Sequence, residues 1–266
     1  MNASEFRKKS NLKWKGLKIL SQIELKAFWR NKNILYSQII QPLMYFLFLV
    51  VGIGGTIGVI NYNNMMIPYE AYALVGIMGL NMTSQMTQTI YRTTIDKRWG
   101  LLPLKFLSGI KPFYYILGMS TFPIIGFVTQ SLILYFLSVI FTLNVHILDF
   151  FLGVSLGIVS LIFWTSLGVL LTVFINDYQK RDTIIAMSIM PIGFSAPTFY
   201  VIDAVPNYIN FIASFNPLTY QIMAMRSIIY GQPNLMYIIL TIGLTTFTLI
   251  ICSIVLLKVK LVVNEK

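Results

Sequence analysis

The chain has 266 residues, of which 56% are hydrophobic and only 11% are charged, and its mean hydropathy is +0.74. Soluble domains average about 25% charged residues, so this composition excludes a soluble enzyme, a disordered linker and a collagen-like fibre. A disulfide-stapled secreted module is excluded because Cys252 is the only cysteine. What remains is an integral membrane protein, in which each helical crossing needs about 20 apolar residues.

The basic residues are distributed unevenly along the chain. Twenty Lys and Arg against nine Asp and Glu give a formal net charge of +11. Nineteen of the twenty fall into four clusters, before residue 34, over 92–111, at 180–181 and after 257, and Arg226 is the exception. Cytoplasmic loops of membrane proteins carry an excess of Lys and Arg. We therefore expect a multi-pass protein of the cell membrane with both termini in the cytoplasm and no nucleic-acid partner.

The uncharged stretches between these clusters predict an all-α integral membrane fold. Six transmembrane helices are expected, at roughly 34–60, 71–91, 112–141, 150–175, 183–200 and 234–257. The chain then divides into a cytoplasmic amphipathic helix over 1–33, a transmembrane domain over 34–257 and a cytoplasmic tail over 258–266. Short outer loops are expected at 61–68 and 144–149.

The first 33 residues have the pattern of an interfacial helix. Basic and polar residues recur every four positions on one face (Lys18, Gln22, Lys26, Arg30), and apolar residues fall on another (Leu17, Leu20, Ile23, Ala27, Phe28). Such a helix lies in the inner headgroup layer in contact with membrane lipids, a depth that also suits Trp14 and Trp29. A general membrane anchor and a specific docking role are both compatible with this pattern.

The second basic cluster, over 92–111, joins two predicted helices on the inner side. It mixes charged residues with apolar ones, so it is too apolar for a solvated loop and too short for a domain. A surface with an apolar centre and a charged rim is typical of a docking site for a partner protein. An interfacial segment that rests on lipid headgroups is the alternative.

The predicted helices contain no Asp, Glu, Lys, Arg or His. Gradient-driven transporters usually place ionisable groups near mid-membrane, so the chain has no evident way to use an ion gradient. It also lacks a Gly-Lys dipeptide and therefore any phosphate-binding loop of the G-x-x-x-x-G-K-[ST] type. The single histidine, His146, falls in a predicted outer turn. We expect no enzymatic activity, no metal site and no cofactor in this chain.

The segment over 195–226 is apolar but interrupted by Pro197, Pro206 and Pro217. Neither one continuous crossing nor a solvated loop favours this pattern, which instead predicts two short helices that dip into the outer leaflet. Asn216 or Thr219 can cap the second helix, and Pro217 suits its first position. Arg226 is expected near the outer interface, paired with Asp203 or with helix-end carbonyls, as a structural clamp or, alternatively, as a substrate contact.

Four runs of this sequence resemble one known family. They are residues 30–48, the loop Asp96-Lys-Arg-Trp-Gly-Leu-Leu102, Ser195-Ala-Pro-Thr-Phe-Tyr200, and Asn216-Pro-Leu-Thr-Tyr220 followed by Arg226. Together they resemble the membrane subunits of type-2 ABC exporters, the group that contains daunorubicin-resistance and nodulation-factor permeases. The resemblance implies a permease that exports an amphiphilic small molecule, peptide or lipid-like cargo. It also implies a dimer, of identical or related chains, and a separate nucleotide-binding ATPase subunit that carries ATP and Mg.

The same resemblance implies two functional segments. A helix within 92–111 would couple to the ATPase through Asp96, Lys97, Arg98, Trp99, Gly100, Leu101, Leu102, Leu104 and Lys105. A re-entrant outer gate over 199–226 and the residues just before it would involve Pro197, Phe199, Tyr200, Asp203, Asn216, Pro217, Thr219, Tyr220 and Arg226. The family loop often carries Glu-Arg before its glycine, which this chain lacks, so the ion pairs with the ATPase can differ. A gradient-driven transporter and a membrane anchor or assembly scaffold are the alternative functions.

Overall fold

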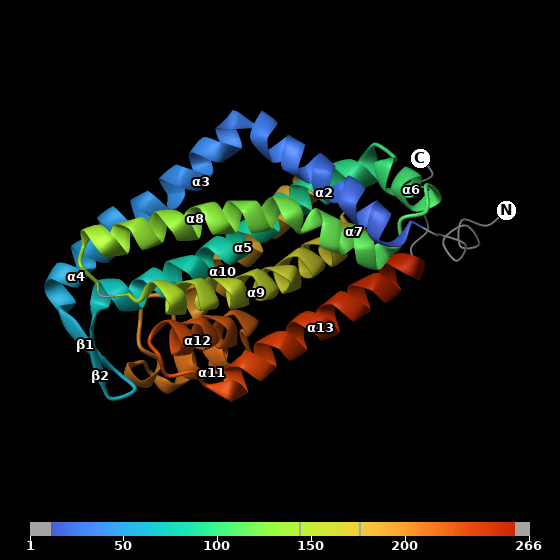
Figure 1. The fold of residues 1–266 in the computed structure, drawn as a ribbon. Coiled ribbons are helices and arrows are strands. Elements are labelled where there is room, and N and C mark those ends of the chain that lie inside the picture. Colours follow the sequence, from blue (N-terminus) through green and yellow to red (C-terminus); the bar gives the residue numbers. More distant parts are fainter. Residues whose placement is uncertain (1–11, 144, 176, 259–266) are drawn as a thin grey trace.

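The computed structural model describes residues 12–143, 145–175 and 177–258, which form an elongated bundle of helices (Figure 1). Residues 1–11 of the predicted interfacial helix and residues 259–266 of the predicted tail lie outside this described part. The helices are α2 (Lys13–Arg30), α3 (Lys32–Met44), the π-helix η1 (Tyr45–Val50), α4 (Val51–Ile57), α5 (Tyr69–Arg98), α6 (Leu101–Leu107), α7 (Pro112–Met119), α8 (Thr121–Ile140), α9 (Ile147–Phe174), α10 (Tyr178–Ser195), the 3-10 helix η2 (Ile202–Ala204), α11 (Asn207–Phe215), α12 (Pro217–Ile229) and α13 (Leu235–Lys258).

Four helical stretches in the described part are long and apolar enough to cross a membrane. They are Lys32–Ile57, Pro112–Ile140, Ile147–Phe174 and Leu235–Lys258, and they coincide with the first, third, fourth and sixth predicted helices. The chain is therefore a multi-pass membrane protein. The second and fifth predicted helices exist as α5 and α10, but both are more polar, so six crossings stay a prediction.

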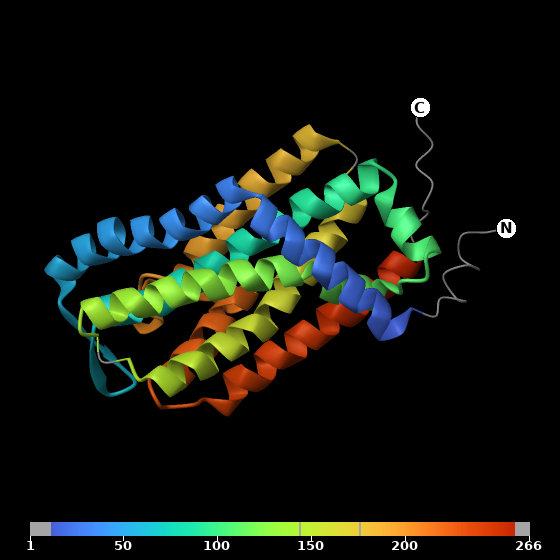
Figure 2. The ribbon, with the colours of Figure 1, turned by 45° about the horizontal axis from the view of Figure 1, so that its top comes forward.

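Helix α5 extends beyond its predicted end and forms the centre of the bundle. It runs without interruption to Arg98, and 20 of its 30 residues are buried. Expecting a loop to begin at Arg92 was wrong, because the polar residues of the last two turns find partners on neighbouring helices and remain helical. Figures 1 and 2 show α5 running behind α8 and beside α9.

A small β-hairpin replaces the loop expected at 61–68. Strands β1 (Val59–Tyr62) and β2 (Met65–Pro68) pair antiparallel, with Tyr62 opposite Met65. The two turn residues, Asn63 and Asn64, have φ angles of 48° and 64°. Asparagine tolerates this left-handed conformation, and two such residues in succession make the turn that suits a tight hairpin. The all-α prediction was wrong for this segment.

Close packing between helices depends on small residues in α9. A Cβ atom at Gly157 would lie 2.6 Å from the ring of Phe127 on α8, and one at Gly153 would lie 2.5 Å from Ile229 on α12. Nearby, the buried indole of Trp164 on α9 donates a 2.7 Å hydrogen bond to Gln221 on α12. These contacts form part of the main apolar core, which lies among α5, α8, α9 and α12.

The bundle has two distinct ends. Figure 1 shows the start of α2, helix α6 and the end of α13 at one end, which we call the α6 end. The hairpin and the C-terminal halves of α3 and α8 lie toward the opposite end, which we call the hairpin end. The first and last described residues thus share one end, and the compartment that this end faces stays a prediction.

Helix α2 packs one face against the bundle and exposes the other. Its buried positions recur every four residues, at Gly16, Leu20, Glu24 and Phe28. The predicted apolar face included Ile23, whose side chain is 48% exposed, and it missed the buried carboxylate of Glu24. Trp14 and Trp29 are both exposed, as an interfacial helix requires.

Candidate functional site

The segment 92–111 consists of the end of α5, the short helix α6 and a return into α7. Trp99 caps the C-terminus of α5, and Gly100 follows with a φ angle of 66°. This left-handed conformation suits glycine and turns the chain directly into α6.

Helix α6 has two apolar faces. Leu102 and Phe106 are buried against the bundle, where the Phe106 ring packs edge-on at 5.5 Å from Tyr115 of α7. On the other side lie four exposed apolar residues, of which Trp99 is 74% exposed. We call these four residues the α6 patch: Trp99, Leu101, Leu104 and Leu107. Several exposed large apolar residues close together in sequence, on a short helix and the residue that caps the helix before it, are typical of a site that receives a partner.

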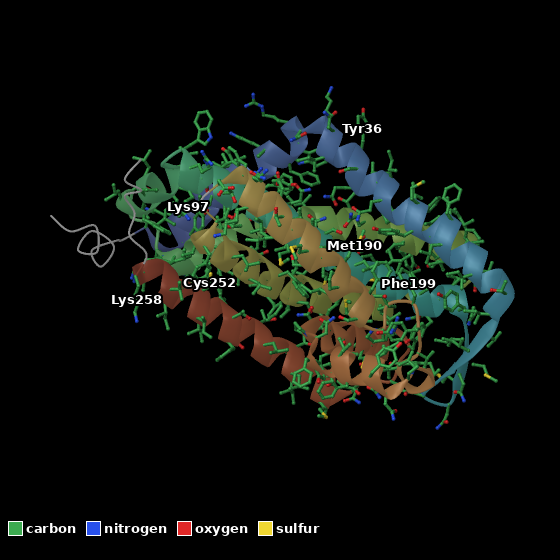
Figure 3. All side chains as sticks on the ribbon, turned by 180° about the vertical axis from the view of Figure 1, so that it is seen from behind. Tyr36, Lys97, Met190, Phe199, Cys252 and Lys258 are labelled. Carbon is green, nitrogen blue, oxygen red and sulfur yellow. The ribbon has the colours of Figure 1, made fainter. Side chains whose placement is uncertain are left out.

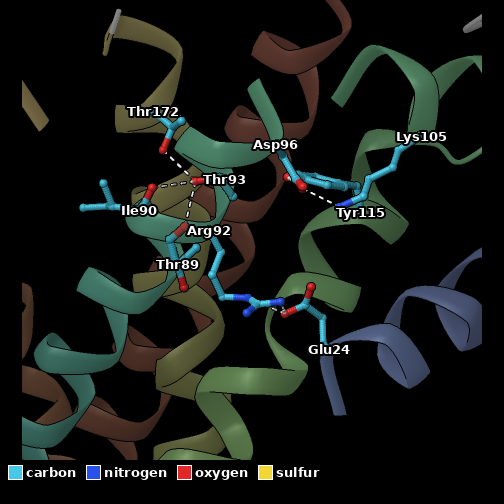
Figure 4. Close-up of polar contacts among 9 residues, drawn as sticks. All are labelled: Glu24, Thr89, Ile90, Arg92, Thr93, Asp96, Lys105, Tyr115 and Thr172. Carbon is cyan, nitrogen blue, oxygen red and sulfur yellow. Dashed lines mark hydrogen bonds and ion pairs between the residues drawn. The ribbon is translucent and has the colours of Figure 1, made fainter. Parts of the chain in front are cut away.

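Five of the six charged residues in this segment contact other groups of the described chain, and the sixth, Lys111, is exposed. The Asp96 carboxylate accepts hydrogen bonds from the ammonium of Lys105 on α6 and from the Tyr115 hydroxyl of α7, the latter at 2.8 Å (Figure 4). One turn earlier, Arg92 forms an ion pair with Glu24 of α2, with N–O distances of 2.6 and 2.7 Å. These pairs connect α5 to α2, α6 and α7.

Two further basic residues connect α5 to other helices. Lys97 Nζ donates to three backbone carbonyls at the end of α9, those of Thr172, Val173 and Ile175, at 2.8 to 3.1 Å. A cation at a helix C-terminus also interacts favourably with the helix dipole. The Arg98 guanidinium lies 4.3 Å from the ring centroid of Tyr178 at the start of α10. Asp96, Lys97 and Lys105 are thus engaged inside the chain, whereas the α6 patch is exposed.

Burial also shifts the pKa of Glu24, the ion-pair partner of Arg92. Desolvation raises the pKa of the Glu24 carboxyl, and the hydrogen bond from Arg92 offsets part of that rise. The Arg92 guanidinium lies 4.6 Å from the ring centroid of Phe122 on α8, so an aromatic face covers its other side.

After α10 come the 3-10 helix η2 and two short helices, α11 and α12, in the segment where the proline pattern predicted two short helices. Their entry into the outer leaflet stays a prediction. Asn216 is the N-cap of α12, where its side-chain oxygen accepts from Leu218 N at 2.9 Å, and Pro217 occupies the first helical position. The Asn216 amide nitrogen also donates to Ile192 O at 2.7 Å and to Ser195 Oγ at 2.9 Å. Asn216 therefore caps the N-terminus of α12 and also connects it by hydrogen bonds to the end of α10.

Arg226 is buried and surrounded by backbone carbonyls. It is 1% exposed and donates to Tyr72 O, Pro197 O and Thr198 O at 2.6 to 3.3 Å. Its guanidinium also lies 3.5 Å from the ring centroid of Tyr72. Two of the three carbonyls follow the end of α10 directly, and the third lies in the first turn of α5. The side chain of Asp203, the other expected partner, lies outside the described part of the structure.

Hydroxyl groups hold the surrounding loop in place. Tyr69 and Tyr72 of α5 donate to the carbonyls of Phe199 and Tyr200 at 3.1 and 2.8 Å. Thr219 and Tyr220 donate back to the last turn of α11, to Ala213 O and Ser214 O. Sequence reasoning missed the tyrosines of α5, because nothing in their spacing indicates contact with residues about 130 positions away.

The spacing G-x-S-x-G, typical of serine hydrolases, does occur at residues 153–157. It lies inside α9, and the Ser155 hydroxyl donates to Phe151 O one turn earlier at 2.8 Å. A hydrolase nucleophile requires a strand-to-helix turn at this position, so the pattern here is part of a packing helix. Within the described ranges, no group of three or more His, Cys, Asp or Glu is placed to hold a metal ion.

Two comparisons with known proteins bear on this arrangement. A search of curated proteins finds no match to the chain. The family model described as "ABC-2 type transporter" matches residues 15–230, which include the α6 patch, the Arg226 site and every described helix between them. The chain therefore belongs to the ABC-2 type transporter family.

Proposed function

We propose that this ABC-2 type permease is the membrane subunit of an ATP-driven exporter. A separate ATPase subunit would hydrolyse ATP, and the permease would act as a dimer of identical or related chains. The cargo would be an amphiphilic small molecule, peptide or lipid-like compound that leaves the cytoplasm across the cell membrane. Family membership supports the transport role, and the α6 patch is the observation that carries the partnership with an ATPase.

The α6 patch offers the ATPase an apolar surface rather than free charges. Trp99 and Leu104 are the most exposed of its four members, at 74% and 60%. Tryptophan is enriched among the residues that carry most of the binding energy of protein interfaces, and the apolar contacts around such a residue exclude water. This composition favours an apolar groove on the ATPase that receives α6.

Helix α5 provides the mechanical connection from this surface to the far end of the bundle. Its 30 residues correspond to about 45 Å of continuous helix. At one end the Asp96–Lys105 pair connects it to α6, and at the other Tyr72 contacts Arg226. A displacement of α6 would therefore tilt α5 and shift α12 and the loop over 196–201, which fits a rigid-body change of access. In this mechanism α11 and α12 are the re-entrant outer gate.

Co-purification tests the partnership. We expect the ATPase encoded beside this gene to co-purify with the wild-type chain. When Trp99 and Leu101 are both changed to Asp, the amount of co-purified ATPase should fall at least about tenfold, because charges would enter an apolar interface. Met66→Asp is the matched control, since Met66 is 76% exposed on the hairpin. ATPase retention that is undiminished in the Trp99/Leu101 variant would contradict the proposal.

A further inference from the structure

Three glutamines from different helices meet inside the bundle. Gln85 Nε2 of α5 donates to Gln38 Oε1 of α3 at 2.6 Å and to Gln130 Oε1 of α8 at 3.1 Å. All three side chains are at most 4% exposed. Gly126 of α8 makes this approach possible, because a Cβ atom there would lie 2.7 Å from Gln85 Nε2.

Four buried polar atoms at this place have no hydrogen-bond partner in the described structure. They are Gln85 Oε1, Gln130 Nε2 and both amide atoms of Asn81. Asn81 is 0% exposed and lies one helical turn before Gln85, so the two side chains project from the same face of α5. We call Gln38, Asn81, Gln85 and Gln130 the amide cluster. Buried amides that lack partners are costly in an apolar bundle, which points to a ligand that completes them.

The helix that covers this cluster is irregular. Pro42 lies within α3 about one turn after Gln38, and the π-helix η1 begins at Tyr45, about two turns after Gln38, so the hydrogen-bonding pattern changes close to the cluster. Such transitions are typical of functional segments and of bends in helices. Polar contacts attach α3 to α5 here, since Gln41 also donates to Ser84 Oγ at 3.0 Å. The opposite face of α3 is exposed, as Figure 3 shows for Tyr36.

We propose that the amide cluster binds the uncharged polar group of an amphiphile, specifically a primary carboxamide, when α3 moves away from α5. The unpaired atoms are two donors, on Asn81 and Gln130, and two acceptors, on Asn81 and Gln85. A primary carboxamide presents two N–H donors and one carbonyl oxygen with two lone pairs, so it complements this set. Helix α8, α3 after Lys32, and the middle of α5 carry no charge, so a charged group would enter without a counter-ion.

The apolar chain of such a ligand has a route to the bilayer along α3. Ile39, the residue after Gln38, is exposed at the side of this helix, whereas Ile40 and Met44 lie on the Tyr36 face, away from the cluster. A chain that leaves the cluster past Ile39 would keep its carboxamide among the amides and reach lipid with its tail. The inference that this ligand is transported cargo rests on the proposed function. The inference that it binds to the amide cluster does not rest on that function.

Thermal unfolding of the full-length chain, purified in detergent without any ATPase, tests the site. We expect dodecanamide to raise Tm with increasing concentration, since a ligand that binds the folded state stabilises it. Methyl dodecanoate, which has no donor, and dodecyltrimethylammonium, which is charged, have the same chain length and should raise Tm little. Asn81→Leu and Gln130→Met should each weaken the response to dodecanamide at least about tenfold in concentration. Gln22→Met, on the exposed face of α2, is the control and should leave the response to dodecanamide unchanged.

The unliganded variants separate binding from folding. Asn81→Leu removes two unpaired buried atoms, so its Tm without ligand should equal or exceed that of the wild type. A dodecanamide response that persists in both Asn81→Leu and Gln130→Met would overturn the proposal. A response no larger than that to methyl dodecanoate would also overturn it and would leave the cluster as a site for water. Either failure, together with normal ATPase co-purification, would leave the proposed function intact.

Discussion

At the scale of single residues, Arg226 is a buried cation that needs hydrogen-bond acceptors from within the described structure. A guanidinium that is 1% exposed must find acceptors inside the protein. It finds them in the carbonyls of Tyr72, Pro197 and Thr198, which belong to two separate segments. Because the fork of donors spans both segments, Arg226 holds the start of α5 and the loop after α10 in one geometry.

Replacing Arg226 should therefore destabilise the protein. Arg226→Met leaves three buried carbonyls without their donor, and we expect the free energy of unfolding to fall by at least about 2 kcal/mol. Arg226→Lys keeps the charge but not the planar fork, so its loss should be intermediate. Thermal unfolding in detergent measures both. A Met variant as stable as the wild type would show that Arg226 does not act as a clamp.

Glu24 should make stability depend on pH. Burial raises its pKa above the ordinary value of 4.5, against the opposing effect of Arg92. The folded protein then holds the proton more tightly than the unfolded chain, so the contribution of Glu24 to stability is present below the ordinary pKa and is lost as pH rises through the raised pKa. The Tm of the wild type relative to Glu24→Gln should fall as pH increases above about 4.5. A relative Tm that rises over this interval would contradict the direction.

At the scale of elements, the short helix α6 depends on its neighbours for its position. Helices of seven residues are not stable by themselves. Leu102 and Phe106 anchor α6 through apolar contact, and the Asp96–Lys105 pair fixes it to α5. A partner that pushes on the α6 patch therefore pushes on α5.

Breaking this pair should loosen α6 selectively. Lys105→Met removes one partner of Asp96 and leaves its buried carboxylate with Tyr115 as the remaining partner among the described residues. Amides of residues 101–107 should then exchange hydrogen about tenfold faster or more, while those in the middle of α9 should not change. Lys111→Met, which alters an exposed lysine nearby, is the control. Unchanged exchange in α6 of the Lys105→Met variant would contradict a positioning role for the pair.

Local patterns predicted some elements well and others poorly. The cap at Asn216 and the proline at Pro217 marked the start of α12 correctly, because capping involves only residues next to each other in sequence. The extension of α5 past Arg92 was not predicted, since a cluster of charges normally ends a transmembrane helix. It continues because Glu24, Lys105 and the end of α9 supply partners from outside the segment.

At the scale of the whole molecule, α5 contacts both candidate functional regions. Its first turn supplies Tyr69 and Tyr72 to the loop after α10, and its last turns supply Arg92, Asp96 and Lys97 to the α6 end. Helix α9 packs along α5, and the hydroxyls of Thr93 on α5 and Thr172 on α9 share a hydrogen bond of 2.7 Å (Figure 4). In the proposed transmission, α5 is therefore the element that contacts both ends.

Composition and the spacing of charges were sufficient to predict a multi-pass membrane protein, because hydropathy and charge clusters are properties of neighbouring residues. The ABC-2 type was predicted from the resemblance of four short runs of the sequence to that family. Composition and spacing could not decide which charges are available to a partner. Asp96 and Lys105 look like a docking rim in sequence but face each other in the fold. Likewise, Arg226 meets a carbonyl 154 residues away, and the glutamines of α3, α5 and α8 converge. Only tertiary packing brings such distant groups together, so only it determines which polar atoms are satisfied and which are left to bind something else.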